Sequence, residues 1–267
     1  MIKLIIPMSG VGKRFKAAGY KEPKPLISVD EKTILEHLIK RFPVSWPKLF
    51  ICNDVDYSND AYRSQLKSIC PEAEIVSIHC HDKGPVHAVL EGLKLSPNFL
   101  SDSDRCIVNY CDFDFSWIPS DFETFVGQTK CDGAVLTYTG FHPEYIRPTL
   151  YAYCREEKGR LLEIKEKGHF TDDRTTEHAS SGTYYFGSGA VLKKYFEKTL
   201  SQGPLINGEA YVSVVYTHLL ADKLDVRIFE IPYFLQWGTP EDLKDYQYWR
   251  KVYSKTLKPV PNSPVEL

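Results

Sequence analysis

The sequence predicts an α/β fold built on a mostly parallel mixed sheet, and two features of its first half carry that prediction. Short runs of β-branched and other apolar residues recur along the chain, which is typical of strands buried on both faces. Between these runs lie longer segments whose apolar residues have helical spacing. Strands that alternate with helices of this length form parallel βαβ units, in which helices cover the sheet on both faces.

The expected elements of the first half follow this alternation. Strands are expected at residues 2–6, 48–52, 74–78, 105–110 and 133–138. Helices are expected at residues 33–42, 57–69, 85–95 and 120–128. Thr33 and Glu36 have the three-residue spacing of a capping box, which fixes the start of the first helix.

Strands and helices no longer alternate regularly after residue 140. Strands expected at residues 151–154, 161–165 and 182–186 have no full helices between them, which predicts an added β layer or a mixed sheet. Helices at residues 190–200 and 209–220 and a strand at residues 226–231 are expected next. Thr239 and Pro240, followed by two acidic residues, mark the start of a last helix.

Composition narrows the class of protein. The 267-residue chain is 43% hydrophobic and 25% charged, close to the globular average, and its net charge of −2 argues against a nucleic-acid binder. It has no apolar run of the roughly 18 residues that a membrane span needs, and residues 1–7 are too short an apolar stretch for a signal peptide. The seven cysteines form no C-x-x-C pair, which predicts reduced thiols. These observations indicate a cytoplasmic α/β enzyme or binding protein.

A glycine-containing loop is expected directly after the first strand. Gly10, Gly12 and Arg14 form a G-x-G-x-R pattern, in which glycines let backbone N–H groups approach a phosphate. The pattern matches neither a P-loop nor a dinucleotide-binding fingerprint, so on its own it predicts no more than a tight turn. Lys24 follows between two prolines, which hold the backbone extended and so aim its ammonium group at a fixed point.

Two carboxylates follow another expected strand. Asp112 and Asp114 come after the apolar residues 106–108, at the carboxyl end of a strand, where open α/β sheets bind ligands. If the strand continues, both side chains point to the same side and could hold a hard cation. A polar exit from the strand is the alternative interpretation of this D-x-D pattern.

In their order along the chain, these motifs resemble those of the sugar-1-phosphate nucleotidyltransferases, closest to a bacterial branch of that family. The resemblance begins with residues 6–15 (IPMSGVGKRF) and residues 19–27 (GYKEPKPLI). It continues through residues 109–114, 166–167, 181–186 (SGTYYF), 207–212 (NGEAYV) and 238–243 (GTPEDL). The resemblance covers about residues 1–250, and several motifs in the family's order are more specific than any one of them.

The resemblance implies one domain of the glycosyltransferase-A type over residues 1–253, although length alone would also fit two domains. Its nucleotide-binding part would be residues 1–139 and its acceptor-binding part residues 140–253, with residues 254–267 as a Pro-rich tail. The implied reaction transfers an NMP from an NTP to a sugar 1-phosphate, giving an NDP-sugar and pyrophosphate for cell-surface polysaccharide precursors. No nucleic acid or membrane span is implied, and a homo-oligomer stays open.

The resemblance also implies roles for individual residues. Arg14, Lys24 and Asp112 would be catalytic, by neutralising the leaving pyrophosphate, binding the transferred phosphate and holding a metal ion. The nucleotide would contact Met8, Ser9, Gly10, Gly12, Lys13, Gly84, His87 and Asp112. The acceptor would contact Glu166, Lys167, Gly182 and Glu209. The implied cofactor is Mg²⁺ or Mn²⁺ on Asp112, with Asp114 as a further candidate ligand.

Gln236 departs from the family pattern. Many members have an aspartate two residues before the Gly-Thr pair, as a second metal ligand, and an amide oxygen is weaker and uncharged. Whether one or two metal ions bind therefore stays open, and so does a catalytically silent regulatory subunit. The sequence is also compatible with a nucleotide-sugar-dependent glycosyltransferase that uses Asp112 and Asp114, and with a transferase that acts on a non-sugar phosphate.

Overall fold

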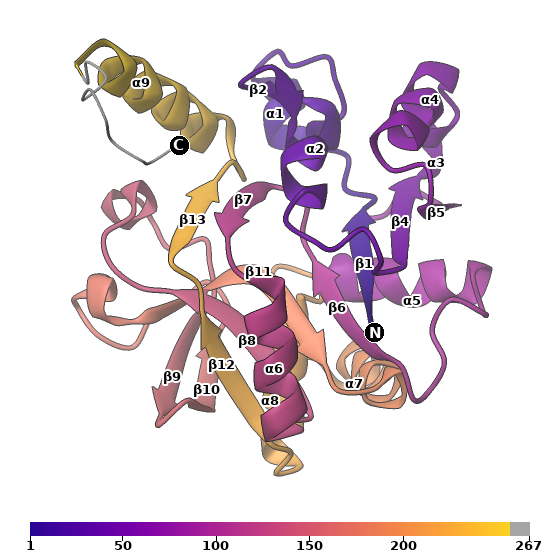
Figure 1. Ribbon diagram of the computed structural model, residues 1–267, viewed down its shortest axis with the longest axis vertical. Helices are drawn as coiled ribbons and strands as arrows, with labels where there is room; N and C mark the ends of the chain where they lie inside the picture. The colour runs from indigo at the N-terminus through magenta and orange to yellow at the C-terminus, as the bar shows by residue number, and fades with distance from the viewer. Residues whose placement is uncertain (257–267) are drawn as a thin grey trace.

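The computed structural model describes residues 1–256, and one mixed sheet runs through its centre (Figure 1). Its strands are β1 (Ile2–Met8), β4 (Lys48–Asn53), β5 (Glu74–Ile78), β6 (Arg105–Asn109), β8 (Gly133–Tyr138), β9 (Tyr153–Glu157), β10 (Arg160–Lys165), β11 (His178–Phe186) and β12 (Val226–Glu230). Their order across the sheet is β5-β4-β1-β6-β11-β8-β12-β10-β9. The predicted α/β fold with a mixed sheet is confirmed.

Parallel pairing is concentrated in the first half of the chain. β5, β4, β1 and β6 are parallel neighbours, as the alternation of strands and helices predicts. β11 is antiparallel to both β6 and β8, and β9 and β10 form an antiparallel pair at the far edge. The strands of the second half therefore extend the main sheet and do not form a separate layer, because β10 pairs with β12 and β9 with β11.

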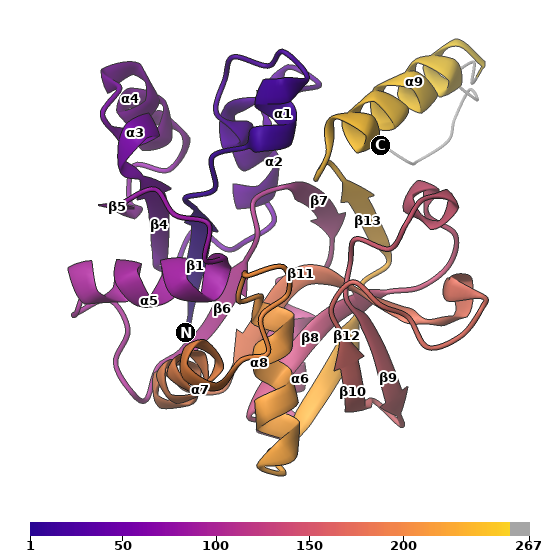
Figure 2. The ribbon, with the colours of Figure 1, turned by 180° about the vertical axis from the view of Figure 1, so that it is seen from behind.

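Helices cover both faces of the sheet (Figures 1 and 2). They are α1 (Lys13–Ala17), α2 (Ile34–Ile39), α3 (Asp54–Tyr57), α4 (Asp60–Ile69), α5 (Pro85–Leu95), α6 (Pro119–Thr129), α7 (Gly189–Gln202), α8 (Val212–Ala221) and α9 (Pro240–Thr256). Side chains of α2, α4 and α6 pack in one apolar cluster, and those of α5, α7 and α8 pack in another. β1 supplies both clusters, since Leu4 and Ile6 face one side and Ile5 the other.

Local capping explains where several helices begin. The capping box of Thr33 and Glu36 is present at the start of α2, as predicted. The helix expected at residues 57–69 begins only at Asp60, as α4, because the Asn59 side chain accepts a hydrogen bond from the Ala61 N–H and caps its start. The short helix α3, which ends at Tyr57, precedes it and was not predicted. Thr239 caps α9, with its Oγ1 accepting from the Asp242 N–H at 3.1 Å. α9 extends to Thr256, so residues 254–256 of the expected tail are helical, and residues 257–267 lie outside the described part.

Several short elements complete the fold, and one pair of them joins the two halves of the chain. Besides the 3-10 helices η1 (Lys24–Leu26), η2 (Pro143–Ile146) and η3 (Arg174–Thr176), they are β2 (Ser28–Val29), β3 (Lys32–Thr33), β7 (Phe113–Ser116) and β13 (Tyr233–Gln236). β7 and β13 form an antiparallel pair that the sequence did not predict. Directly after β13, the Trp237 N–H donates to the Asp112 carbonyl at 3.0 Å. This contact brings the end of the second half to the D-x-D segment of the first.

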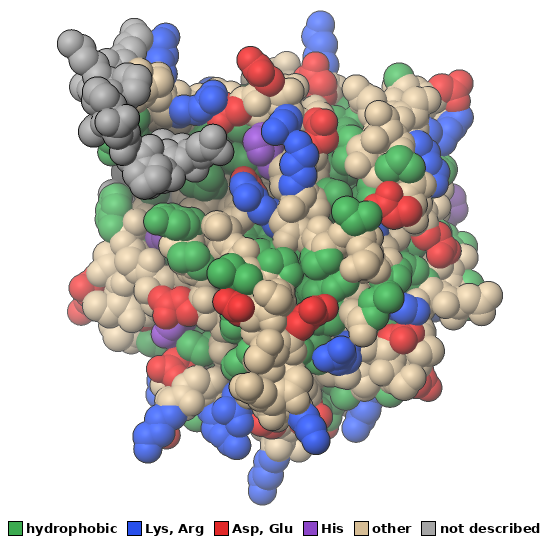
Figure 3. Space-filling view, viewed as in Figure 1, with side chains coloured by type: hydrophobic (Ala, Val, Ile, Leu, Met, Phe, Trp, Pro, Cys, Tyr) green, Lys and Arg blue, Asp and Glu red, His purple; other side chains and the backbone are tan. Residues whose placement is uncertain are grey.

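The structure was compared with two kinds of binding feature, a basic surface for nucleic acid and a helix that spans a membrane. Lys and Arg side chains are interspersed with Asp and Glu on the face seen in Figure 3, which shows no continuous basic patch of the kind that binds nucleic acid. Within residues 1–256, no helix is both long and apolar enough to span a membrane.

Two glycines in helices differ in how closely their surroundings are packed. A Cβ on Gly189, at the start of α7, would overlap the carbonyl oxygen of Ser101, whereas a Cβ on Gly127, in α6, would meet nothing within 4 Å. We expect Gly189→Ala to lower the free energy of unfolding by about 1–3 kcal/mol through overpacking. Gly127→Ala should instead raise it by about 0.5–1 kcal/mol, since alanine favours the helix. Urea unfolding of both variants checks this, and equal effects would contradict the packing described.

Candidate active site

Two cavities meet at the carboxyl ends of β1 and β6. The β1 cavity, of about 340 Å³, is lined by the loop after β1 and by the segment before α5. The β11 cavity, of about 430 Å³, is lined by residues of β11 and by the segments after β10 and β13. Seven residues line both cavities: Gly12, Lys13, Lys24, Tyr110, Asp112, Glu209 and Tyr211. The two cavities are therefore halves of one site, at the edge of the sheet where α/β folds bind ligands.

The loop after β1 forms the floor of the β1 cavity. The predicted nucleotide contacts that line it are Met8, Ser9, Gly10, Gly12, Lys13, Gly84 and Asp112. Gly12 adopts φ +63°, a conformation that a side chain would strain, and it caps the start of α1. Because the loop carries two glycines, its backbone is open to a ligand.

Lys24 is fixed at the junction of the cavities. Its Nζ donates to Asp112 Oδ2 at 2.8 Å and to the Gly238 carbonyl at 2.9 Å. It also lies 5.4 Å from the centre of the Phe15 ring, within the range of a cation–π interaction. The Lys24 side chain is 17% exposed and that of Asp112 is 33% exposed. The ammonium group is therefore held in place and still accessible from both cavities.

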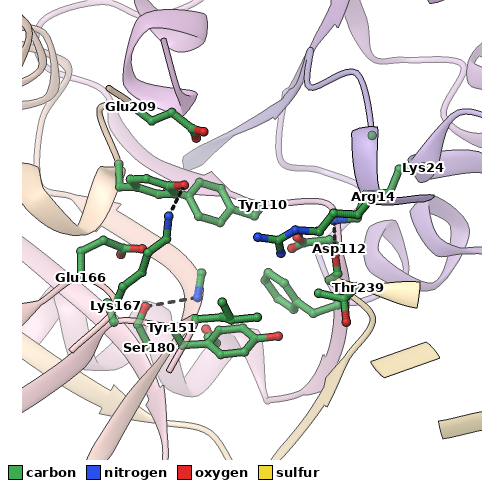
Figure 4. Close-up of a pocket in the computed structure, with 18 of the residues that line it drawn as sticks. Arg14, Lys24, Tyr110, Asp112, Tyr151, Glu166, Lys167, Ser180, Glu209 and Thr239 are labelled. Carbon is green, nitrogen blue, oxygen red and sulfur yellow. Dashed lines mark hydrogen bonds and ion pairs between the residues drawn. The ribbon is translucent and has the colours of Figure 1, made fainter. Parts of the chain in front are cut away.

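Cations approach the β11 cavity from two sides. Figure 4 shows Arg14, Lys24 and Asp112 on one side and Glu166 and Lys167 on the other. Arg14 extends from the first turn of α1 into the cavity. A ligand between the two sides would meet positive charge at both ends.

The predicted acceptor contacts all line the β11 cavity: Glu166, Lys167, Gly182 and Glu209. Lys167 Nζ donates to the Tyr211 hydroxyl at 2.7 Å, and burial and a hydrogen bond with Glu209 raise the pKa of Tyr211. Gly182 has φ +88°, and a Cβ there would come within 3.0 Å of the Phe113 ring. A glycine is thus required for the close packing of β11 beneath the cavity.

Glu166 is a carboxyl group at the back of the β11 cavity. Ser213 Oγ donates to its Oε2 at 2.6 Å. Burial raises the pKa of Glu166, against the opposing effects of that hydrogen bond and of Lys167. A carboxylate in such a position is a strong acceptor for hydroxyl groups of a bound ligand.

Asp114 does not join Asp112, and the prediction of a shared metal site is wrong on this point. Its carboxylate accepts two hydrogen bonds from Arg41, at 2.7 Å from Nε and 2.6 Å from the terminal nitrogen. The Asp114 side chain is only 4% exposed and lines neither cavity. The chain bends between β6 and β7, so the two aspartates are not successive positions of one straight strand. Asp114 therefore stabilises the contact of β7 with α2.

His87 also lies elsewhere than predicted. It lines neither cavity, and its ring packs edge-on against His81 with centroids 4.7 Å apart. His81 and Asp82, which the sequence did not assign to the nucleotide site, line the β1 cavity instead. Gly84 does line the β1 cavity. Its φ of +87° also serves packing, since a Cβ would come within 2.7 Å of the Ala210 backbone.

Tyrosines are the main site residues that the sequence did not assign. Tyr110 and Tyr211 line both cavities, and Tyr151 and Tyr184 line the β11 cavity. Tyr110 accepts a hydrogen bond from the Val212 N–H and so ties the first motif to the start of α8. Tyr110 and Tyr211 lie within segments that carry the family resemblance, which is the signal that could have found them.

The donor set suits one magnesium ion held with substrate. Within residues 1–256, no three His, Cys, Asp or Glu side chains are grouped as a metal site. Gln236 lines neither cavity, and its Nε2 lies 3.4 Å from Asp242 Oδ1. Asp112 is accessible at the junction, and Mg²⁺ is commonly bound by one or two carboxylates together with substrate phosphates and water. The residues present therefore fit a metal that arrives with a phosphate ligand.

The mixed sheet and the double cavity at its edge define a nucleotide-binding transferase domain of the glycosyltransferase-A type. The chain belongs to the MobA-like NTP transferase domain family, whose model matches residues 4–171. It is therefore a nucleotidyltransferase, which confirms that part of the predicted activity. A comparison with curated protein sequences gave no significant match.

Solved structures share the fold over almost the whole chain. A nucleoside-diphosphate-sugar pyrophosphorylase from Vibrio cholerae RC9 has a TM-score of 0.74 at 21% identity, covering 92% of this chain and 99% of that one. A putative glucose-1-phosphate thymidylyltransferase from Bacillus anthracis has a TM-score of 0.68 at 16% identity, covering 97% of both chains. An inositol-1-phosphate CTP transferase from T. maritima has a TM-score of 0.67 at 15% identity, covering 97% of this chain and 98% of that one. These similarities show that the predicted single-domain fold is correct.

The assignment of Asp114 can be tested by stability and turnover together. We expect Asp114→Asn to lower the free energy of unfolding by about 2 kcal/mol, because Arg41 loses its charged partner. Asp102→Asn is the matched control, since that aspartate is 77% exposed in its ion pair with Lys193, and it should change stability by less than about 0.5 kcal/mol. Folded Asp114→Asn should keep its turnover. A strong loss of metal-dependent turnover without a loss of stability would return Asp114 to the metal site.

Glu166 gives a stability prediction with a definite pH dependence. A carboxyl group whose pKa is raised by folding destabilises the folded state when it is charged. This cost appears as the pH rises past the pKa of the unfolded chain and is complete above the folded pKa. Glu166→Gln should therefore raise the free energy of unfolding at neutral pH, and the gain should vanish below about pH 4. Urea unfolding across this range measures it, with Glu163→Gln, a 41%-exposed carboxylate of β10, as the control. A gain that does not vary with pH would contradict the raised pKa.

Proposed function

We propose that the protein transfers an NMP from an NTP to a sugar 1-phosphate, giving an NDP-sugar and pyrophosphate. The observation that carries the proposal is the position of Lys24 and Asp112, which line both cavities and touch each other at their junction. A phosphate transferred between two ligands must lie at such a junction, since each ligand enters from its own side. The proposed product would serve polysaccharide precursors, and the reaction would take place in the cytoplasm.

The nucleotide occupies the β1 cavity. Its base and ribose lie between the loop of Ser9 and Gly10 and the segment of His81 and Gly84. Its phosphates reach the junction, where Gly12 exposes the backbone and Lys13 and Arg14 supply positive charge. This orientation places the α-phosphate beside Lys24 and Asp112.

The acceptor occupies the β11 cavity, with its phosphate toward Lys167 and its hydroxyl groups toward Glu166. The Tyr211 hydroxyl accepts a hydrogen bond from Lys167 and shares another with Glu209, so it holds the Lys167 ammonium at the edge of the cavity. Tyr211 is accordingly a positioning residue. Glu166 is held in place by the hydrogen bond from Ser213 and can accept hydrogen bonds from ligand hydroxyl groups. It therefore favours a polyhydroxylated acceptor over a plain alcohol phosphate.

The chemistry needs no nucleophilic side chain. An oxygen of the acceptor phosphate forms a new P–O bond with the α-phosphorus of the NTP. The bond from that phosphorus to the bridging oxygen of the β-phosphate breaks, and its electron pair leaves with pyrophosphate. The acceptor phosphate is already an anion, so no proton has to be removed from it.

Charge neutralisation is then the main contribution of the protein. Lys24 binds the phosphate at the centre of the reaction and stabilises the charge that develops there, while Arg14 neutralises the leaving pyrophosphate. Binding the two substrates in adjoining cavities lowers the barrier further, because the reacting atoms are already held close together. Asp112 would hold Mg²⁺ with the NTP phosphates, and the ion would supply further positive charge to them.

Two measurements separate the competing activities: pyrophosphate release from NTPs and the hydrolysis of NDP-sugars. Pyrophosphate release is measured with five NTPs against several sugar 1-phosphates and inositol 1-phosphate, each with Mg²⁺. The proposal expects release that depends on both a sugar 1-phosphate and an NTP. Turnover with inositol 1-phosphate alone would show a non-sugar acceptor. Hydrolysis of NDP-sugars without pyrophosphate release would indicate a glycosyltransferase, and no turnover with any pair would indicate a silent subunit.

The two central cations should dominate turnover. Lys24→Ala and Arg14→Ala should each lower the rate of pyrophosphate release by about two to three orders of magnitude, as expected for groups that stabilise developing charge. Lys16→Ala is the matched control, since Lys16 lies in the same helix as Arg14, is exposed and lines neither cavity. Circular dichroism checks that the variants fold. A near-normal rate in Lys24→Ala or Arg14→Ala would remove that residue from the mechanism.

A further inference from the structure

A third cavity, which we call the α9 groove, lies outside the proposed active site. It has a volume of about 1010 Å³, larger than either active-site cavity. α9, β13 and the segment around η2 form its walls. Five Phe, Tyr and Trp side chains are part of the lining: Phe141, Phe234, Tyr246, Trp249 and Tyr253.

Aromatic residues of this groove remain open to solvent. Trp249 is 49% exposed, Tyr253 is 56% exposed and Phe141 is 68% exposed. Trp249 and Tyr253 are four residues apart in α9, so they lie on the same side of the helix. An exposed cluster of large apolar side chains on a folded protein marks a surface that binds something.

The charged groups of the groove are already paired within the chain. Arg147 forms ion pairs with Asp242 and Asp245, and Arg250 pairs with Asp30. A polyanionic ligand would have to break these pairs to gain a cation. The groove therefore fits an apolar ligand that binds by shape and by contact with aromatic rings.

The chain itself carries a segment of that chemistry. Residues 257–267 (LKPVPNSPVEL) follow directly after α9 and contain three prolines, of which Pro261 and Pro264 have P-x-x-P spacing. Such segments favour the extended polyproline II conformation and dock into grooves lined by aromatic side chains. Val260 and Val265 add apolar side chains beside the prolines.

The length of the segment is sufficient. The groove follows α9 from Asp242 to Ser254, a helical distance of about 18 Å. Eleven residues in polyproline II conformation span about 34 Å, which leaves several residues for the turn at the end of α9. Covalent attachment gives such a segment an effective concentration in the millimolar range, so weak contacts are enough for binding.

We propose that residues 257–267 bind in the α9 groove of their own chain through the prolines at 261 and 264. The groove shares a wall with the β11 cavity, because Asp242 accepts from the Thr239 N–H and Gly238 next to it accepts from Lys24. A segment bound in the groove would stabilise this shared wall on the side away from the β11 cavity. The proposal stands independently of the reaction proposed above.

Tryptophan fluorescence in the full-length chain tests the proposal. Trp249 is half exposed, whereas Trp46, Trp117 and Trp237 are 2%, 8% and 0% exposed, so acrylamide quenching reports chiefly on Trp249. The double variant Pro261→Ala/Pro264→Ala should increase the quenching constant about twofold. The matched control, Asn262→Ala/Ser263→Ala, keeps both prolines and should leave it unchanged. Trp249→Phe in each background confirms the source of the signal.

A synthetic peptide of residues 257–267 provides the second arm. It should restore protection of Trp249 in the proline double variant and should have little effect on the unaltered chain, whose groove is occupied. Identical quenching in all full-length variants, with no effect of the peptide, would overturn the proposal. Protection that depends on protein concentration would also overturn it, because a second copy of the chain would then be the occupant.

Discussion

The contacts of Lys24 hold together three parts of the chain that are far apart in the sequence. Its ammonium group binds the Asp112 carboxylate, which follows β6, and the Gly238 carbonyl, which follows β13. A buried cluster of Phe15, Ile27, Val29, Ile34, Trp237 and Leu243 supports the same junction from beneath. Because apolar packing fixes the surrounding backbone, the cation is in position before any ligand binds, as catalysis by charge stabilisation requires.

This junction also explains why the two halves of the chain form one domain. β13 returns to pair with β7, and the Trp237 N–H donates to the Asp112 carbonyl, so the late segment completes a site begun by the early one. Neither half alone would enclose both cavities, since residues from both line each of them. A length of 267 residues, which would fit two domains, therefore forms one domain with two adjoining cavities, the proposed nucleotide side and the proposed acceptor side.

The sequence predicted well what local patterns determine. β5, β8 and α5 have the predicted bounds, because each combines a clear apolar pattern with a distinct start or end. Contacts over long sequence separations could not be predicted in this way. The same-side expectation for Asp112 and Asp114 assumed a straight strand, and nothing local reveals that Arg41, 73 residues away, binds the second aspartate. β7 and β13 are four residues each and become strands only by pairing with each other.

The same reasoning accounts for the glutamine at position 236. Gln236 is 7% exposed, and its amide group lies beside the Asp242 carboxylate, whose pKa is raised by burial. An aspartate at 236 would put two carboxylates together in a poorly solvated place beside a single ion-pair partner of Asp242 among the described residues, Arg147. The Gln236 amide instead donates a hydrogen bond to Asp242 and adds no negative charge. Asp242 in turn holds the Thr239 N–H at the start of α9. The departure from the family pattern therefore stabilises the wall that presents the Gly238 carbonyl to Lys24, and it leaves Asp112 as the carboxylate at the junction of the two cavities.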